Sequence, residues 1–246
     1  MTEQPKNFGF GEDETMLKDS AAKFFADNCS ADKIHSQVAE DPNIHRSIEC
    51  IWDKGLWQQI TELGWTAACV PEEAGGLGMP LVAAVAIAEE AGKAAFPSPL
   101  ISTMIASFVL KECHSDAATK ALGDVASGVP MTLAVTNKLG SWEPSDTDVA
   151  AAGTTLNGTA YFVQDAQKCD RFVVSATTPK GVALFLVDAN AAGVSITPDG
   201  IIDLTRDQAH VEFKNVEAIE LAAPGTGEAS LASALPAIQT IITADM

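Results

Sequence analysis

Residues 56–79 read LWQQITELGWTAACVPEEAGGLGM, and this stretch indicates how the first half of the chain is built. Its first part continues a stripe of apolar residues that are spaced three and four apart, as on one face of a helix: Ile48, Ile51, Trp52, Leu56, Ile60 and Leu63. Gly64 follows the stripe, and glycine is the residue type that most often ends a helix. The stretch therefore predicts a helix that closes at Gly64.

The glycine-rich residues 70–79, VPEEAGGLGM, have two interpretations. Such a loop can bind phosphate through its backbone N–H groups, but this one lacks the Lys and Ser/Thr of a P-loop. The carboxylates of Glu72 and Glu73 would also repel a phosphate. We therefore favour a tight turn between two helices, in which the glycines supply positive φ angles.

The pattern around this stretch stays helical as far as about residue 128. EDETMLKDSAAKFFADN (12–28) places Leu17, Ala21, Phe24 and Phe25 on one face, with acidic residues in its first turn. PLVAAVAIAEEAGKAA (80–95) is rich in alanine and opens with Pro80, as the start of a helix often does. Two more helical segments are predicted around 99–112 and 115–127.

Short β-runs separated by turn residues follow from about residue 130 to 222. They are MTLAVT, TAYFV, RFVVSAT, GVALFLVDA, GVSITP and AHVEFKNV, all rich in β-branched and aromatic residues. The dipeptide Asn157–Gly158 predicts a hairpin turn. An antiparallel, barrel-like β-domain accounts for so many short strands.

Helical spacing returns at the end of the chain, after the Pro/Gly-containing segment APGTGEAS (223–230). Five apolar residues of 231–246 form one stripe: Leu231, Leu235, Ile238, Ile241 and Ile242. The predicted fold class is therefore α+β. Its parts are an all-helical domain over 1–128, a β-domain over 129–226, and the start of a further helical domain over 227–246.

The composition restricts the possible partners. Asp and Glu outnumber Lys and Arg by 33 to 15, and the formal net charge of −18 opposes binding to nucleic acid or to an anionic membrane surface. The polar N-terminal residues resemble neither a secretory signal nor a transit peptide, and no apolar run reaches the roughly 20 residues of a membrane span. We expect a cytoplasmic protein.

The metal-binding and redox residue types are dispersed. The five cysteines and four histidines show no spacing typical of a metal site or a redox pair. We therefore expect reduced, mostly buried thiols and no metal. No catalytic residue can be assigned from local patterns either.

Three segments are candidates for a binding site, although an ordinary structural role explains each of them as well. AVTNKLGSW (134–142) carries Thr136 and Ser141 after a predicted strand, where hydroxyl and N–H groups can hold the polar edge of a cofactor or remain a polar loop. YFVQDAQKCD (161–170) places Phe162 and Gln164 on one side of a strand, where they can face a planar heterocycle or serve packing and solvation. In DLTRDQAH (203–210), Arg206 can bind an anion or pair with the flanking Asp203 and Asp207.

The order of these motifs resembles the acyl-CoA dehydrogenase family over nearly the whole chain. Residues 56–79 are similar to that family's "elGw…vPeeyGGlG" segment, and LNGTAYFVQDAQKCDRFVVSA (156–176) is similar to its "lnGxKxwIxNgxxAdxxlvxA" hairpin. LFLVDANAAGVSI and AHVEFKNVEA correspond to the two segments that usually follow. The resemblance implies a helical domain, a β-domain and a four-helix C-terminal domain, of which residues 231–246 would be part of the first helix.

The resemblance also implies a function. Enzymes of this family remove an α-proton and a β-hydride from an acyl-CoA, with flavin adenine dinucleotide (FAD) as hydride acceptor and an electron-transfer flavoprotein as the usual acceptor of the electrons. The usual base would lie beyond Met246, so this chain alone is expected to be inactive. A homo- or hetero-oligomer is also implied.

By the same resemblance, four residues are expected at the cofactor: Thr136 near the flavin, Ser141 near the pyrophosphate, Phe162 in the place of a tryptophan beside the flavin ring, and Gln164 in the place of a hydroxyl residue that hydrogen-bonds the flavin. Asn137 replaces an acidic residue, and GSW stands where the family has GSD. With these departures the sequence resembles one branch of the family, the bacterial heteromeric acyl-CoA dehydrogenases for steroid or other bulky acyl groups. The alternative is therefore a non-catalytic, FAD-poor partner subunit.

Overall fold

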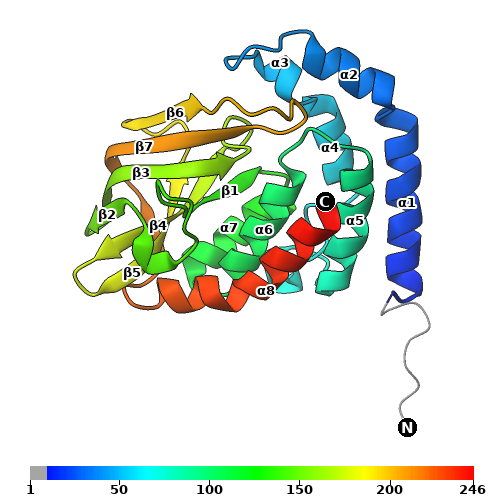
Figure 1. The fold of residues 1–246 in the computed structure, drawn as a ribbon. Helices are drawn as coiled ribbons and strands as arrows, with labels where there is room; N and C mark the ends of the chain where they lie inside the picture. Colours follow the sequence, from blue (N-terminus) through cyan, green and yellow to red (C-terminus); the bar gives the residue numbers. More distant parts are fainter. Residues whose placement is uncertain (1–9) are drawn as a thin grey trace.

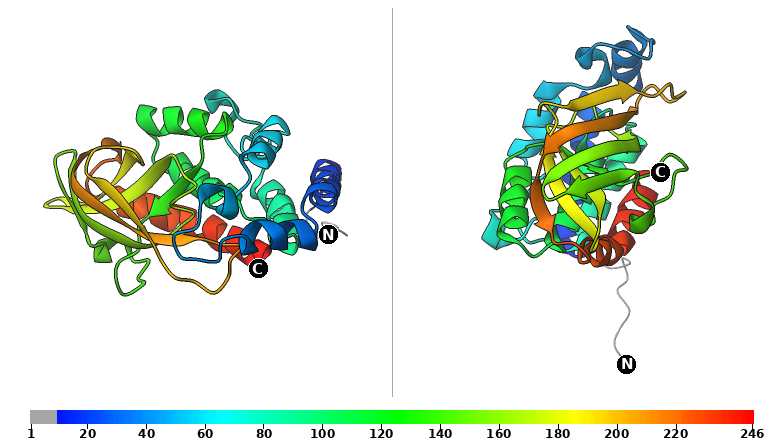
Figure 2. Two further views of the ribbon diagram at one scale, coloured as in Figure 1. Left: turned by 90° about the horizontal axis from the view of Figure 1, so that it is seen from above. Right: turned by 90° about the vertical axis from the view of Figure 1, so that its left-hand side faces the viewer.

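The computed structural model describes residues 10–246. The first nine residues, which include most of the N-terminal stretch predicted to hold no targeting signal, lie outside the described part. Helices gather on one side and strands on the other, and the last helix runs along both groups (Figures 1 and 2). This arrangement confirms the predicted α+β class.

The helical side consists of seven α-helices and a short 3-10 turn in chain order. Their bounds are α1 Glu12–Asn28, α2 Ala31–Ala39, α3 Ile48–Ile51, α4 Lys54–Glu62, η1 Glu72–Ala74, α5 Leu81–Lys93, α6 Leu100–Lys111 and α7 Asp116–Ala126. The helices predicted over 12–28, 80–95, 99–112 and 115–127 all form. Helix α2 is an element that the apolar spacing did not predict. It starts at Ser30, whose hydroxyl accepts a hydrogen bond from Lys33 N.

The helix predicted from Ile48 to Leu63 is wrong as a single element, because it is interrupted after Ile51. Trp52 and Asp53 are extended, and the Asp53 carboxylate accepts hydrogen bonds from Gly55 N and Leu56 N to start α4. The end is as predicted: Gly64 has φ +79°, and its N–H donates to Thr61 O.

The glycine-rich residues 70–79 form the tight turn that we favoured. Gly75 and Gly78 have φ of +85° and +61°. Leu77 N, Gly78 N and Met79 N donate back to carbonyl groups of residues 67–70, so these N–H groups are already used. The turn closes the helical core and offers little to a phosphate.

The strand side is one eight-stranded sheet in the order β6-β7-β3-β2-β4-β5-β8, with β1 also paired to β4. The bounds are β1 Met131–Ala134, β2 Val149–Ala152, β3 Thr155–Gln164, β4 Arg171–Thr178, β5 Gly181–Asp188, β6 Val194–Pro198, β7 Gln208–Glu217 and β8 Ile219–Ala222, with a 3-10 turn η2 at Pro144–Asp146. Most pairs are antiparallel, as predicted. The pairs of β4 with β1 and with β2 are parallel, so the sheet is mixed.

The hairpin turn predicted at Asn157–Gly158 is wrong. The β2–β3 turn lies earlier, at Gly153 and Thr154, because Ala152 pairs with Thr155. Asn157 and Gly158 lie inside β3 at a register shift, where Gly158 has φ +134°. A Cβ on Gly158 would lie 2.2 Å from Asp148 O, so glycine here permits a close backbone approach and makes no turn.

The last helix, α8 (Gly227–Asp245), begins within the segment that we expected to be a linker, and it packs against α5, α6 and β5. Three residues of the predicted stripe are buried, Leu231, Ile238 and Ile241, together with Ala234, which was not part of it. Leu235 stays 38% exposed. The stripe thus finds its partner mainly within this chain.

The loop between β6 and β7 connects both sides of the molecule. Arg46, between α2 and α3, donates hydrogen bonds to Leu204 O and Arg206 O at 2.7 and 3.3 Å. Arg206 pairs with Asp245 of α8 and not with its neighbours Asp203 or Asp207, which corrects the predicted pairing. The cause is tertiary, since Asp207 is engaged by Lys168.

The five cysteines are free thiols and four of them are buried, as expected. Among the helices described, none has the length and apolar character required to cross a membrane.

Candidate functional site

Three of the four predicted site residues line one small cavity. Thr136 follows β1, whereas Phe162 and Gln164 come from the end of β3. The cavity, of about 20 Å³, is bounded by nine residues: Ser102, Ile105, Thr132, Leu133, Thr136, Trp142, Phe162, Gln164 and Ile242. It therefore lies where α6, β1, the end of β3 and α8 meet.

A backbone hydrogen bond brings these residues together. Tyr161 N donates to Thr136 O at 2.9 Å, at the point where the pairing of β3 with β7 shifts between Ala160 and Val163. Phe162 has φ +53° there, a left-handed conformation that is strained for a bulky residue. The irregularity leaves the Phe162 side chain 42% exposed beside the cavity. Strain of this kind is frequent at functional sites.

Trp142 is a cavity residue that sequence reasoning missed. It is 45% exposed and follows Ser141 in the loop. Its position in GSW was noted as a departure from GSD, and an aromatic residue beside a candidate cofactor loop was the available signal. Ser102 was also missed. The signal there was a hydroxyl in the mostly apolar helix 100–111, which is buried over almost its whole length and also carries Thr103 and Ser107.

Ser141, the fourth predicted residue, does not line this cavity. Its hydroxyl donates to Asp146 Oδ2 at 2.7 Å, and its N–H donates to Asn137 Oδ1 at 2.9 Å. Lys138 N donates to Asp148 Oδ2 at 2.8 Å. The donors of loop 137–146 are therefore largely satisfied within the chain, and a carboxylate lies next to Ser141.

Asn137 organises that loop. Its Oδ1 accepts from Leu139 N as well as from Ser141 N, and its Nδ2 donates to Asp146 O at 3.1 Å. The residue is buried. Asn137 stands where the family has an acidic residue, and this difference has a structural use. The amide of Asn137 can donate a hydrogen bond to the Asp146 carbonyl, whereas a carboxylate cannot.

A group of buried charges lies beside the cavity. Lys168 Nζ is 2.8 Å from Asp165 Oδ1 and 2.8 Å from Asp207 Oδ1. Burial raises the pKa of Asp207 to about 6, although Lys168 opposes the shift and Asp165 adds to it. Burial by itself would lower the pKa of Lys168, but the two carboxylates outweigh it and the pKa is raised.

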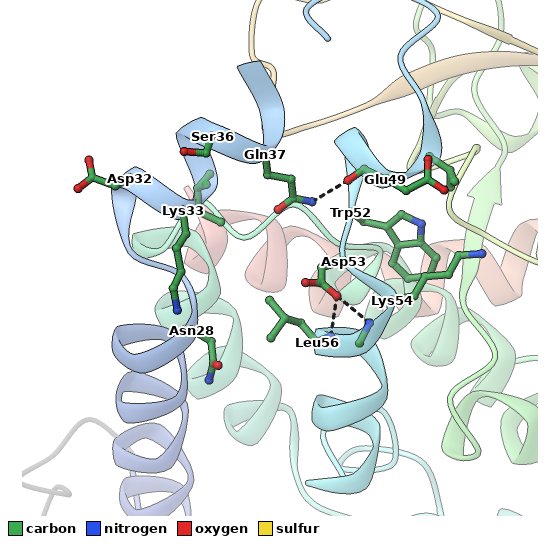
Figure 3. Close-up of a pocket in the computed structure, with 13 residues that line it drawn as sticks. Asn28, Asp32, Lys33, Ser36, Gln37, Glu49, Trp52, Asp53, Lys54 and Leu56 are labelled. Carbon is green, nitrogen blue, oxygen red and sulfur yellow. Dashed lines mark hydrogen bonds between the residues drawn. The ribbon is translucent and has the colours of Figure 1, made fainter. Parts of the chain in front are cut away.

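A wider hollow of about 780 Å³ lies elsewhere, between the end of α1 and helices α2, α3 and α4 (Figure 3). It contains none of the predicted site residues. Several of its polar side chains already serve the fold, since Gln37 donates to Glu49 O and Asp53 starts α4. Volume alone does not make it the functional site.

Comparison with known proteins relates this geometry to a family. Residues 11–129 match the family model described as acyl-CoA dehydrogenase, N-terminal domain. Acyl-CoA dehydrogenase IpdE2 of Mycobacterium tuberculosis is 30% identical over 118 residues, which are 48% of this chain and 34% of that protein. The aligned segment is thus about a third of the length of that curated relative.

Solved structures agree along almost the whole chain. The Tcur3481-Tcur3483 steroid ACAD is 26% identical with a TM-score of 0.80, covering 96% of this chain and 62% of that one. The ChsE4-ChsE5 complex from Mycobacterium tuberculosis is 23% identical with a TM-score of 0.75, covering 91% of this chain and 60% of that one. The second likeness is one of fold.

Proposed function

Because the chain belongs to the acyl-CoA dehydrogenase family, we propose that it forms part of an enzyme that dehydrogenates an acyl-CoA thioester between its α- and β-carbons. The observation that carries this proposal is the convergence of Thr136, Trp142, Phe162 and Gln164 on one cavity. FAD, when bound, would supply the hydride acceptor. The chain's own residues would bind and orient its ring.

The ring end of the cofactor fits these residues. Phe162 and Trp142 are 42% and 45% exposed, so each presents aromatic surface on which a planar ring can stack. The Gln164 amide and the Thr136 hydroxyl can donate or accept hydrogen bonds at its polar edge. The cavity is too small for the ring to enter, so the ring would contact these exposed faces.

The catalytic base is proposed to come from outside this chain. The nine residues that bound the cavity include no carboxylate within the described chain, and α8 contributes only Ile242. A proton can be removed only by a group within hydrogen-bond reach. Residues 10–246 would therefore hold the flavin ring, and a further helical domain would supply the base.

The partners of the complete enzyme follow from the same proposal. They are an acyl-CoA substrate, an electron-transfer flavoprotein-type acceptor, and further subunits of a homo- or hetero-oligomer. One of the structural relatives, Tcur3481-Tcur3483, is a steroid ACAD. We extend this substrate class to the present chain as part of the proposal.

A second candidate is a FAD-poor partner subunit, and the Ser141–Asp146 contact favours it. The hydroxyl expected at the pyrophosphate donates to a carboxylate instead. A diphosphate placed there would meet the negative charge of Asp146 and, at Lys138 N, that of Asp148. In this role the chain would complete an oligomer and shape the substrate pocket.

The two candidates are separated by the visible absorption spectrum of the chain after incubation with FAD and desalting. Retained flavin supports the first candidate. In that case Phe162→Ala and Gln164→Ala should each weaken binding by about tenfold. Leu139→Ala is the control, because Leu139 is 92% exposed in the neighbouring loop that carries Trp142 and does not line the cavity.

A colourless chain would argue for the second candidate. The same measurement on a longer chain that continues past Met246 into a helical domain then decides between them. Flavin bound only by the longer chain restores the first candidate. Failure of both chains to bind overturns it.

A further inference from the structure

The end of β3 is attached to a buried ion cluster that the proposed chemistry does not use. We define this cluster as Asp165, Lys168 and Asp207. The Lys168 side chain is 1% exposed, and the side chains of Asp165 and Asp207 are 8% and 5% exposed. Two carboxylates thus share one ammonium group in the interior. Asp207 Oδ2 has no hydrogen-bond partner among residues 10–246.

The cluster joins three separate parts of the fold. Asp165 follows β3, Lys168 lies in the turn between β3 and β4, and Asp207 precedes β7. Asp165 Oδ2 accepts a hydrogen bond of 2.6 Å from the Ser102 hydroxyl of α6. Ser102 itself bounds the cavity. The cluster therefore lies one hydrogen bond from the cavity wall.

The backbone of the same segment is held at both ends. At one end, Tyr161 N donates to Thr136 O. At the other end, Asp165 N donates to Asp207 O at 3.0 Å and Lys168 N donates to Asp165 O at 2.9 Å. Between these anchors lie the two cavity residues of β3, Phe162 and Gln164.

This segment needs such anchors because its conformation is unfavourable. Phe162 and Asp165 have φ of +53° and +54°, and neither is a glycine. A side chain with a Cβ adopts the left-handed region at an energetic cost, so the surrounding contacts must impose it. Without them, we expect β3 to relax toward regular pairing with β7, which would turn Phe162 away from its present position.

An ion cluster is an expensive way to fill this space. Removing an ammonium and two carboxylates from water is costly, and well-packed apolar residues of the same volume are often as stable. Charge-assisted hydrogen bonds are, however, directional. The ammonium of Lys168 donates to both carboxylates only when the three side chains hold one relative arrangement. Its use here is therefore better explained by positioning than by stability.

We propose that Lys168 is a positioning residue for the flavin-facing wall: its ammonium, held between Asp165 and Asp207, fixes the left-handed segment that presents Phe162 and Gln164 to the cavity. The inference rests on the proposed function, because the wall serves chemistry only if the cavity receives a flavin ring. The conformational part of the inference can be tested separately.

The test compares the full 246-residue chain with two variants and a control. Lys168→Met removes the ammonium but leaves two buried carboxylates, and this imbalance can prevent folding. The triple variant D165N/K168M/D207N removes all three charges and decides the question if the single variant does not fold. Lys180→Met is the control, because Lys180 is an exposed lysine in the next turn of the same sheet.

Two readouts are needed. Hydrogen exchange of the amides of residues 161–166 reports the conformation of the segment, with β5 as an internal reference. We expect exchange to quicken at least about tenfold in a folded variant while β5 is unchanged. If FAD binds, its affinity should fall about tenfold and the visible circular dichroism of the bound flavin should change. Lys180→Met should match the unmodified chain.

The possible outcomes separate this inference from the proposed function. A folded triple variant with unchanged exchange at residues 161–166 overturns the inference, even if flavin binding is normal. If the unmodified chain binds no flavin in any form, the first candidate function fails, and faster exchange in the variant still supports the positioning of the segment by Lys168. Unchanged flavin dichroism in a variant with faster exchange overturns the link to the flavin.

Discussion

Arg206 Nη2 lies 2.8 Å from Asp245 Oδ2 and joins the loop before β7 to the last turn of α8. The side chains of the two residues are 31% and 13% exposed. The contact therefore lies between a surface ion pair and a buried one in energetic terms. This ion pair, together with the packing of α8 on β5, connects the last helix to the sheet side of the molecule.

Arg206→Met should destabilise the chain more than Asp245→Asn does. Loss of the guanidinium leaves a mostly buried carboxylate without its partner, at a cost of about 1–2 kcal/mol, whereas an amide at position 245 can still accept a hydrogen bond from Arg206. Urea unfolding measures both effects. Lys214→Met is the control, because its pair with Glu212 is exposed. Equal losses for the two substitutions would refute the asymmetry.

The stability of the chain should depend on pH through Asp207. Its pKa is raised by burial from 3.8 to about 6, so the folded state binds a proton more tightly than the unfolded state does. Asp207 therefore contributes a penalty above pH 6 that disappears as the pH falls toward 4. The groups that face it are Asp165 and Lys168.

The measurement is the difference in unfolding free energy between the unmodified chain and Asp207→Asn. Between pH 7 and pH 5 this difference should shift in favour of the unmodified chain, by up to about 1 kcal/mol per pH unit. Other carboxylates titrate in both proteins and cancel. A difference that stays constant across this range would show that Asp207 keeps an ordinary pKa.

Asp146→Asn should increase the affinity of the chain for FAD. The substitution removes the negative charge beside Ser141 but keeps an oxygen at position 146 that can accept a hydrogen bond from the Ser141 hydroxyl. Removal of one like charge near a diphosphate is expected to be worth about 1 kcal/mol, or about fivefold in the dissociation constant. A flavin titration followed by absorbance checks this, with Glu220→Gln as the control, because Glu220 is an exposed carboxylate of β8 outside the loop 137–146. Unchanged affinity would show that the carboxylate does not oppose the cofactor.

The elements that depend on local spacing were largely predictable from sequence. Helices α1, α5, α6 and α7 follow from apolar residues on one face and from the residue types at their ends, because a helix closes its hydrogen bonds within a few residues. The turn at 70–79 was predictable for a similar reason, since Gly75 and Gly78 supply the positive φ angles. Phe162 and Gln164 were placed on one side of β3, and both bound the cavity.

Predictions failed where a distant partner decides the conformation. Asn157–Gly158 has the composition of a hairpin turn but lies within β3, because β2 pairs with this part of β3 and places Val149 opposite Gly158. Arg206 has two aspartates within three residues, yet it pairs with Asp245 of α8. In both cases the local residue types favoured one conformation or partner, and pairing with a distant part of the chain decided another.

The sequence by itself indicated most of the helices and strands in their order, the resemblance to the family, and three residues that bound the cavity, because these depend on spacing and motif order along the chain. Only the tertiary structure decided that Trp142 and Ser102 bound the cavity and that the Ser141 hydroxyl donates to Asp146. It also decided that Lys168 is buried between Asp165 and Asp207. The physical reason is that ion pairs and cavity walls form between groups close in space. Which groups become neighbours is set by strand register and helix packing, which no short window of sequence contains.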